Sequence, residues 1–277
     1  MNATATLRRT SYLPFPLLIG AAIIVLMLVC AAAPGWLAPY DPLAFDYSAL
    51  LKPPSLAHPF GADNFGRDIL SRTIYATRID MQIAVFATLA PLLIGSFVGL
   101  VAGYFGGWLD LVLGRIIDLV LTFPFLVIVI AIVAVLGPGL VNMYIAVSVV
   151  GWVFYARLMR GEVLVQKQLD YVAAAHVLGY GPARILFRHI LPNAARPILV
   201  YWVTDMALKI LLGSSLGYLG LGAQPPEAEW GVLIADGKNF FTQAWWMTLF
   251  PGIAIVLAGL SFSLAGDGLA DALDVER

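Results

Sequence analysis

Two charged residues within a long apolar stretch have a spacing that would permit chemistry inside a membrane. Asp205 and Lys209 are the only charged residues of positions 197–226. A separation of four places both side chains on one face of a helix. If that helix starts near Ile198, Lys209 lies about 16 Å along it, near the centre of a bilayer. Intramembrane charges usually face an interior or a pathway. The two residues either line a translocation path or neutralise each other's charge at a helix–helix contact. If the helix starts later than Ile198, Asp205 would instead lie at the membrane interface.

The other polar residues form no visible catalytic or metal-binding constellation. The four lysines are followed by Pro, Gln, Ile and Asn, so the Gly-x-x-x-x-Gly-Lys-Ser/Thr loop that cradles phosphates is missing. The three histidines lack the spacing of a ligand pair, and the single cysteine, Cys30, permits no internal disulfide. We predict that the chain is not an enzyme and binds no metal or cofactor. If ATP drives its function, another chain must hydrolyse it.

The composition identifies an integral membrane protein. Of 277 residues, 61% are hydrophobic and 12% are charged, whereas soluble domains are about 45–50% apolar and about 25% charged. One soluble core cannot bury so many apolar side chains, so we expect the protein surface to contact a lipid membrane. The formal net charge of −1 argues against nucleic acid as a partner.

Apolar segments predict an all-α fold with six membrane spans. A membrane helix needs about 20 mostly apolar residues. The charge-free stretch 119–156 is too long for one crossing, and Gly137-Pro138-Gly139 divides it with a turn signal. The predicted spans are 15–35, 83–105, 116–137, 140–158, 198–219 and 248–267. They belong to a single transmembrane domain, 1–277, with a tail 1–14 and connecting segments 36–82, 159–197 and 220–247.

The distribution of Lys and Arg predicts the orientation. One side of the six spans carries ten of these residues near helix ends and the other carries five. The richer side is expected to be cytoplasmic, which places both termini and the 159–197 loop in the cytoplasm and the 36–82 and 220–247 segments outside. The first apolar run exceeds the about 7–15 residues of a signal peptide core, so we expect it to be retained.

A polar, basic island at 170–193, DYVAAAHVLGYGPARILFRHILPN, interrupts the apolar spans. We predict a helix over 162–178 that stops at Gly179, and a second over 182–191 that starts at Pro182 and ends at Pro192. Three consecutive alanines, 173–175, offer a low surface that can enter a partner's groove. The alternative is a hairpin lying on the membrane, with its arginines on lipid phosphates.

The island resembles the EAA loop of binding-protein-dependent ATP-binding-cassette (ABC) importer permeases, whose pattern is Glu-Ala-Ala, three residues, Gly, then Leu-Pro. The matching residues are Ala173, Ala174, Ala175, Gly179, Leu191 and Pro192, while His189 and Asn193 match the His-x-Leu-Pro-Asn ending of the peptide/nickel subgroup. Ala173 replaces the glutamate of the pattern, and Asp170, one helical turn earlier, is its candidate substitute.

Other motifs extend the resemblance over positions about 35 to 275. They include segments 58–63, 66–72, 102–107, 218–222, 251–252 and 266–269. Each motif is weak alone, but their order and spacing are specific. The chain is similar to the C-type permease subunit of dipeptide, oligopeptide and nickel importers.

This resemblance implies a type I importer permease with a cytoplasmic coupling helix, in the inner membrane of a bacterium. It implies a heterodimer with a second related permease, two cytoplasmic ATPases that bind ATP and Mg, and an extracytoplasmic solute-binding protein. The chain would form half of a pore for peptides or a similar small solute. The implied ATPase-coupling residues are Asp170, Tyr171, Ala173, Ala174, Ala175, Gly179, His189, Leu191 and Pro192.

Several residues of the outer segments are candidates for contact with the binding protein. Gly66, Arg67 and Asp68 begin an expected external helix over 64–78, which is either a local cap with a surface ion pair or a contact for the binding protein. Glu227 and Trp230 are candidates for the same docking. For Asp205 and Lys209, the pathway interpretation would have the pair meet the charged ends of a peptide.

Two rival functions stay open from the sequence. A proton-coupled carrier would use Asp205 and Lys209 as a relay, and a membrane scaffold would transport nothing. The carrier leaves the cytoplasmic island unexplained, and a scaffold would show no uptake defect on deletion. The substrate, whether dipeptide, oligopeptide, chelated nickel, sugar or another solute, is not fixed by these patterns.

Overall fold

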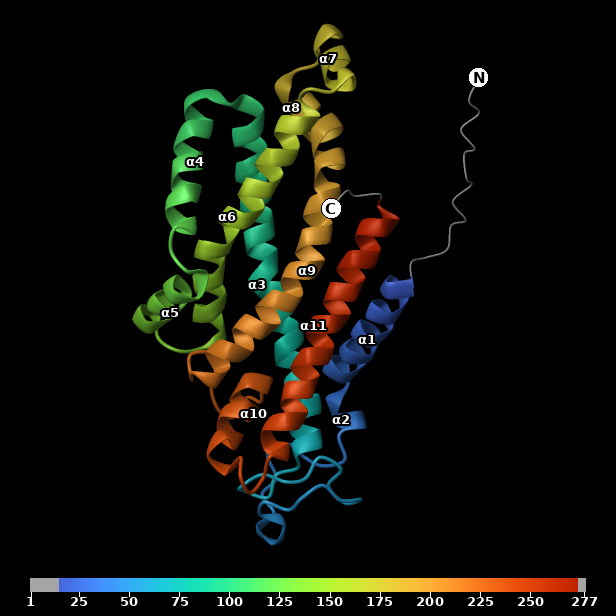
Figure 1. The fold of residues 1–277 in the computed structure, drawn as a ribbon, viewed down its shortest axis with the longest axis vertical. Coiled ribbons are helices and arrows are strands. Elements are labelled where there is room, and N and C mark those ends of the chain that lie inside the picture. The colour runs from blue at the N-terminus through green and yellow to red at the C-terminus, as the bar shows by residue number, and fades with distance from the viewer. Residues whose placement is uncertain (1–14, 274–277) are drawn as a thin grey trace.

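The computed structural model describes residues 15–273, and this part of the chain is helical without a β-strand. The long helices are α1 (Phe15–Ala32), α3 (Ile69–Phe105), α6 (Leu140–Gln166), α9 (Leu191–Tyr218) and α11 (Trp246–Ala272). They run side by side along the length of the molecule (Figure 1). The all-α class predicted from the sequence is confirmed. The predicted tail 1–14 lies outside the described residues.

Five helical stretches within 15–273 are long and apolar enough to cross a membrane, and the bent pair α4 (Gly107–Leu121) with α5 (Phe125–Leu136) makes a sixth if the two helices together form one crossing. Shorter helical segments join them. These are α2 (Pro34–Leu37), α7 (Asp170–Val177), α8 (Pro182–Arg184), α10 (Trp230–Gly237), 3-10 turns at Tyr47–Ala49 and Lys238–Phe240, and a π-helical turn at Ile185–Ile190. Positions of the membrane boundaries stay a prediction.

The third predicted span, 116–137, is not one straight helix. Helices α4 and α5 meet at an angle of 86°. Proline disfavours a helical conformation of the residue before it, and Pro124 follows Phe123 directly at this bend. Pro124 itself has an extended ψ of 124° at the start of α5. The sequence therefore contained the signal for this break. The predicted turn at Gly137-Pro138-Gly139 does separate α5 from α6.

Helix α3 joins two elements that the sequence treated as separate. The expected external helix over 64–78 and the span over 83–105 form one helix of 37 residues. Asp68 caps its start, because the Asp68 Oδ2 atom accepts hydrogen bonds from the Ser71 amide at 2.8 Å and the Ser71 hydroxyl at 2.7 Å. A carboxylate at this position satisfies amides that lack helical partners. The outer part of α3 is therefore rigidly continuous with its apolar part.

Helices α3 and α6 pack with their backbones in close approach. A Cβ atom on Gly95 or Gly99 would overlap the carbonyl oxygen of Trp152 or Ala156, respectively. Small residues permit such approach between membrane helices, where van der Waals packing replaces the hydrophobic effect. The same face buries Tyr155 and Met159 of α6. The packed pair α3 and α6 therefore forms the centre of the helical bundle.

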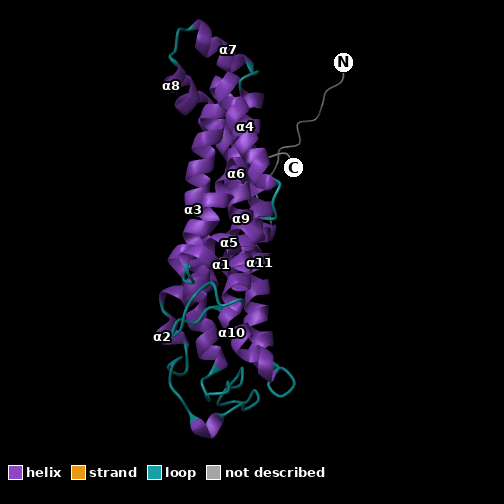
Figure 2. Ribbon diagram, turned by 90° about the vertical axis from the view of Figure 1, so that its left-hand side faces the viewer, coloured by secondary structure: helices purple, strands orange, loops and turns teal. Residues whose placement is uncertain are grey.

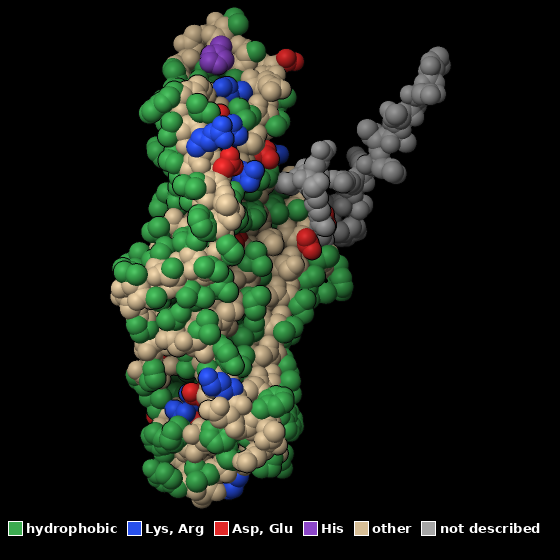
Figure 3. Space-filling model, turned by 60° about the vertical axis from the view of Figure 1, so that its left-hand side comes forward, with side chains coloured by type: hydrophobic (Ala, Val, Ile, Leu, Met, Phe, Trp, Pro, Cys, Tyr) green, Lys and Arg blue, Asp and Glu red, His purple; other side chains and the backbone are tan. Residues whose placement is uncertain are grey.

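Polar side chains gather toward the two ends of the molecule. In Figure 3, Lys, Arg, Asp and Glu lie near both ends, and the face between them is largely apolar. Figure 2 shows helices α7 and α8 at one end and the long loops at the other. We call these the hairpin end, built on residues 166–193, and the loop end, built on residues 33–68 and 219–245. An apolar belt between polar ends is the pattern expected of a membrane-spanning protein.

Candidate functional site

The first arm of the hairpin end is fixed to the helices beneath it. Lys167 follows α6, and its Nζ atom donates a 2.6 Å hydrogen bond to the Tyr104 carbonyl near the end of α3. A cation at this place also suits the negative end of the helix dipole. The Tyr171 hydroxyl donates a 2.6 Å hydrogen bond to Gln166 Oε1. These bonds hold α7 against the ends of two long helices.

Gly179 forms the corner of the hairpin. The Tyr180 amide bonds to the Ala175 carbonyl at 3.1 Å, and the Gly179 amide bonds to the His176 carbonyl at 2.9 Å. This pair of bonds is a Schellman motif, which requires a left-handed residue after the helix. Gly179 supplies it with φ of +74°. The predicted stop at Gly179 and restart at Pro182 are confirmed, but the predicted helix over 162–178 is wrong as one element, because α6 ends at Gln166 and α7 begins at Asp170.

The second arm of the hairpin does not end at Pro192, and that prediction is wrong. The π-helical turn Ile185–Ile190 leads directly into α9. Pro192 lies in the first turn of α9, where its missing N–H is tolerated. The Asn193 side chain donates a 2.8 Å hydrogen bond to the His189 carbonyl. The second arm of the hairpin therefore continues without interruption into α9, the helix that carries Asp205 and Lys209.

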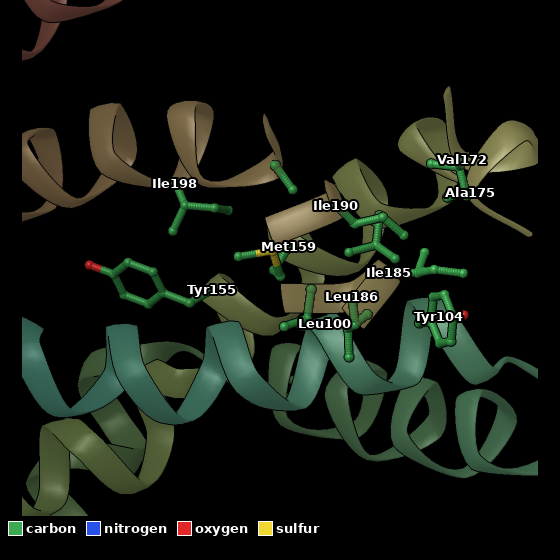
Figure 4. Packing of buried hydrophobic residues seen from close by; sticks show 12 residues of the cluster. Leu100, Tyr104, Tyr155, Met159, Val172, Ala175, Ile185, Leu186, Ile190 and Ile198 are labelled. Carbon is green, nitrogen blue, oxygen red and sulfur yellow. The ribbon is translucent and has the colours of Figure 1, made fainter. Parts of the chain in front are cut away.

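Apolar side chains from both arms form one buried cluster with the long helices. Figure 4 shows Val172 and Ala175 of α7 close to Ile185, with Leu186 and Ile190 reaching toward Leu100 of α3. Val172 and Ala175 are 1% and 3% exposed. Close-packed interiors transmit displacement rather than absorb it. The buried cluster therefore anchors α7 to residues of α3, α6 and α9.

The opposite face of α7 is apolar and uncovered. Ala173 and Ala174 are exposed, and Val177 and Leu178 are 88% and 68% exposed. We call these four residues the apolar tip. Their spacing of three and four places them on one helical face. The sequence interpretation expected Ala173, Ala174 and Ala175 on this surface, but Ala175 is buried, and it missed Val177 and Leu178 although their helical spacing was readable. Asp170, Gly179 and Pro192 are also exposed.

The remaining predicted coupling residues support the hairpin from inside. The rings of Tyr180 and His189 stack with centroids 5.6 Å apart and planes at 8°. The Arg184 guanidinium carbon lies 3.9 Å from the Tyr180 ring centroid, an arrangement that favours cation–π attraction. Tyr171, His189 and Leu191 are half-buried. These side chains fix the corner and leave the apolar tip free.

Asp205 and Lys209 form a buried ion pair within this chain. Lys209 Nζ donates to Asp205 Oδ1 at 2.9 Å, and the Tyr155 hydroxyl donates to Asp205 Oδ2 at 2.8 Å. Lys209 also lies 4.8 Å from the Phe125 ring centroid. The two residues are 1% and 6% exposed. The geometry matches the interpretation in which the pair joins α9 to α6 and α5, and a role in the pathway stays a prediction.

The loop end uses its charged residues to hold itself together. Asp63 is fully buried and accepts from Arg67 Nε at 2.6 Å and Arg72 Nη1 at 2.8 Å. Arg72 Nη2 also donates to Asp236 at 3.2 Å. Asp68 also caps α3, and its Oδ1 atom lies 3.0 Å from His58 Nδ1, within hydrogen-bonding distance. The ion pairs connect the outer segment to α3 and α10.

Two of the predicted docking residues at this end are buried instead. Trp230 is 1% exposed, its Nε1 atom donates to the Thr73 carbonyl at 3.1 Å, and its amide donates to Asp80 Oδ2 at 3.1 Å. Asp68 is 2% exposed. Neither side chain is available to an outside protein, because each is buried and hydrogen-bonded within this chain. Arg67 is largely occupied by Asp63, whereas Glu227 is exposed.

Glu229 is a further buried carboxyl that the sequence interpretation did not single out for this role. It caps α10 by accepting from the Gly231 and Val232 amides at 2.8 and 3.0 Å. Burial raises the pKa of the Glu229 carboxyl, although these two amides oppose the shift. Asp80 of α3 contacts the same carboxyl. A Cβ on Gly217 would overlap Glu229, so the small residue in α9 admits this cap.

Within residues 15–273, no group of three or more His, Cys, Asp or Glu residues could hold a metal ion. Many of the polar residues described above serve helix caps, ion pairs or the hairpin corner. The arrangement suits mechanical transmission between two ends of a helical bundle.

Comparisons with known proteins agree with this architecture. Residues 95–275 match the family described as binding-protein-dependent transport system inner membrane component. A dipeptide transport system permease protein of Alkalihalophilus pseudofirmus is 44% identical over 224 residues, covering 81% of this chain and 74% of that protein. A probable D,D-dipeptide transport system permease of Escherichia coli is 42% identical over 254 residues, covering 92% and 85%. A glutathione transport system permease of Pectobacterium atrosepticum is 42% identical over 258 residues, covering 92% and 86%.

These matches extend along the bundle and the hairpin described above. They support an importer permease and lend nothing to a proton-coupled carrier. Such a permease is not an enzyme, since separate ATPase subunits hydrolyse ATP. The chain belongs to the binding-protein-dependent ABC importer permeases and is a multi-pass C-type permease subunit of a bacterial importer.

Proposed function

We propose that this chain forms half of the pore of an ATP-driven importer for short peptides. The relatives at 42–44% identity are named for dipeptides, D,D-dipeptides and glutathione, all of them short peptides or close analogues. The second half of the pore would be a related permease in a heterodimer. A solute-binding protein would deliver the peptide from outside, and the complex would lie in the bacterial cytoplasmic membrane with both termini in the cytoplasm.

The hairpin end carries this proposal. The apolar tip (Ala173, Ala174, Val177 and Leu178) projects from a hairpin whose other face is packed into the bundle. In the proposed complex, the tip enters a groove on one of two cytoplasmic ATPases, which bind ATP and Mg. Closure of the ATPase pair would push the hairpin, and the buried cluster would pass this displacement to α3 and α9. Bistable packing between the two permeases would then switch the pore between its inward and outward states.

Ala173 stands where the loop pattern has glutamate, and this difference changes the expected contact between the hairpin and the ATPase. Ala173 has no charge to pair with the ATPase, and Asp170, in the first turn of α7, is exposed one helical turn away. The dominant contact is therefore apolar, with Asp170 as its polar rim. Burial of Val177 and Leu178 in a partner groove would supply about 1.5–3 kcal/mol for each side chain.

Co-purification and uptake test the proposal together. The tagged chain is expected to bring down a second permease and an ATPase from native membranes in mild detergent, as identified by mass spectrometry. Leu178→Asp should abolish recovery of the ATPase while keeping the second permease. Leu56→Asp is the matched control, because Leu56 is also exposed but lies in the outer segment.

The assembled complex, in proteoliposomes with its binding protein, should import a radiolabelled dipeptide only with ATP. Uptake driven by a pH gradient without ATP would defeat the proposal. Recovery of the chain alone, or as a homodimer without ATPase, would defeat it as well.

A further inference from the structure

A cavity of about 640 Å³ opens at the loop end, and none of its lining residues belongs to the ion pairs described above. Its walls come from the segment after α1, from the outer part of α3 and from the loop before α10. The polar residues of its lining are Tyr40, Asp41, Tyr75, Arg78 and Glu227. The rest of the lining is apolar or glycine. This volume lies within the range of about 300–1,000 Å³ that is typical of small-ligand sites.

Two of the three charged side chains in this cavity have no partner among the described residues. Arg78 and Glu227 are exposed, and within residues 15–273 their side chains make no hydrogen bond or ion pair. Arg67 and Arg72, in contrast, are paired with Asp63. One oxygen of Asp41 accepts from the Leu43 amide at 2.8 Å, which leaves its second oxygen available. One cation and two anions thus face a shared space with capacity for a ligand.

The walls of the cavity are held in fixed positions. The Tyr40 amide donates to Ser71 Oγ at 3.1 Å, and its hydroxyl donates to the Ala57 carbonyl at 3.0 Å. Arg78 lies on the continuous helix α3, and Glu227 stands two residues before the Glu229 cap of α10. These bonds fix the backbone segments that carry the charged groups, whose side chains are exposed. A fixed backbone leaves only the side chains to be ordered when a ligand binds.

We propose that this cavity binds a zwitterionic short peptide at the outer mouth of the pore. Arg78 binds the terminal carboxylate, because the planar guanidinium can donate two parallel hydrogen bonds to it. Asp41 and Glu227 bind the terminal ammonium. Two residues of extended peptide span about 7 Å, a length that a cavity of this volume accommodates. The inference rests on the proposed import of peptides and adds a subsite on this chain.

A photoreactive tripeptide tests the subsite on the assembled complex in nanodiscs. The probe is alanyl-benzoylphenylalanyl-alanine with free termini, compared with its carboxy-terminal amide and its amino-terminal acetyl form. Wild-type complex should be half-labelled by the free probe at a concentration at least about tenfold lower than by either blocked form. Mass spectrometry should locate the label on segments 35–43, 75–79 or 226–228.

Substitutions separate the two ends of the peptide. Arg78→Met should remove the preference for the free carboxylate and keep the preference for the free amine. Asp41→Asn combined with Glu227→Gln should do the reverse. Arg78→Lys should retain part of the carboxylate preference, which guards against a folding defect in the methionine variant. Lys238→Met is the control, because Lys238 lies outside the cavity, 5.6 Å from the Tyr218 ring centroid.

Several outcomes would overturn the subsite. An unchanged carboxylate preference in Arg78→Met, or label outside the cavity, would do so. If Arg78→Met instead weakens stimulation of ATPase activity by the binding protein, with preferences intact, the cavity is a docking surface for that protein. Failure of the proposed function is distinct, because the wild-type complex itself would then import no dipeptide with ATP.

Discussion

The two ends of this molecule use their side chains in opposite ways. At the loop end, Asp63, Arg72 and Asp236 are consumed by internal ion pairs, and Trp230 is buried against α3. At the hairpin end, the polar side chains lock a corner while Val177 and Leu178 stay uncovered. The difference indicates where each end can meet a partner. The hairpin end offers an apolar face on one short helix, whereas the loop end offers the exposed charge of Glu227 beside scattered exposed apolar side chains such as Trp36 and Leu56.

The largest effect is expected from breaking a buried charge pair between the two ends. Lys209→Met leaves Asp205, 1% exposed, with Tyr155 as its one remaining side-chain donor. Removing one partner of a buried ion pair typically costs about 3–5 kcal/mol. We expect a fall in the melting temperature of the detergent-purified protein. A double variant, Asp205→Asn with Lys209→Met, should recover most of this loss.

Peptide uptake by the double variant separates the two interpretations of this pair. If the pair only joins helices, uptake recovers together with stability. If it lines the pathway, uptake stays low in a protein that is again stable. A Lys209→Met variant that transports like wild type at normal expression would exclude the pathway role.

A second prediction compares the ends directly. Arg72→Met removes one of the two arginines that neutralise the buried Asp63 carboxylate. We expect a loss of about 3 kcal/mol, near the lower end for buried pairs because Arg67 remains. Arg188→Met at the hairpin end should change stability little, since Arg188 is exposed. Equal melting temperatures for the two variants would contradict the contrast between the ends.

The hairpin corner gives a smaller, conformational effect. A Cβ on Gly179 would meet open space, but its φ of +74° is unfavourable for alanine. Gly179→Ala should therefore cost about 1 kcal/mol through the backbone alone. Gly179→Asn should cost less, because asparagine tolerates this conformation. Hydrogen exchange at Leu178, Gly179 and Tyr180 amides is the measurement, and identical exchange in both variants would contradict this explanation.

The smallest expected effect is a dependence of stability on pH at the loop end. The folded protein raises the pKa of Glu229 above its ordinary value of 4.5 because the carboxyl is buried. The stability contributed by the protonated form is complete below the unfolded pKa and is lost as pH rises through the folded pKa. Melting temperature should therefore fall as pH rises above about 4.5, and Glu229→Gln should reduce this slope. A steeper slope in the glutamine variant would show that the sign is wrong.

The sequence predicted the features that depend on local chemistry. The apolar segments, the glycine corner at Gly179 and the start at Pro182 are local patterns, and the structure has them. The break at Pro124 and the face shared by Val177 and Leu178 were also local, but were not recognised. In each case proline geometry or helical spacing provided the signal.

Other features depend on partners distant in sequence and could not be predicted. Trp230 is buried because its ring reaches the Thr73 carbonyl, 157 residues away. A tryptophan near acidic residues in an outer loop otherwise suggests an exposed contact. The passage of the helix through Pro192 similarly depends on a π-helical turn and on Asn193, which satisfies the His189 carbonyl. At Trp230 and at Pro192, tertiary packing therefore overrides what the local sequence favours.

Crosslinking from the apolar tip tests the central claim most directly. Cys30 is the only cysteine of the chain, so Cys30→Ser provides a background in which Leu178→Cys can carry a benzophenone maleimide. In native membranes, illumination should join this chain to an ATPase, and the same reagent on Leu56→Cys should not. If position 178 yields no ATPase adduct, or position 56 yields as much, the hairpin is not the coupling surface.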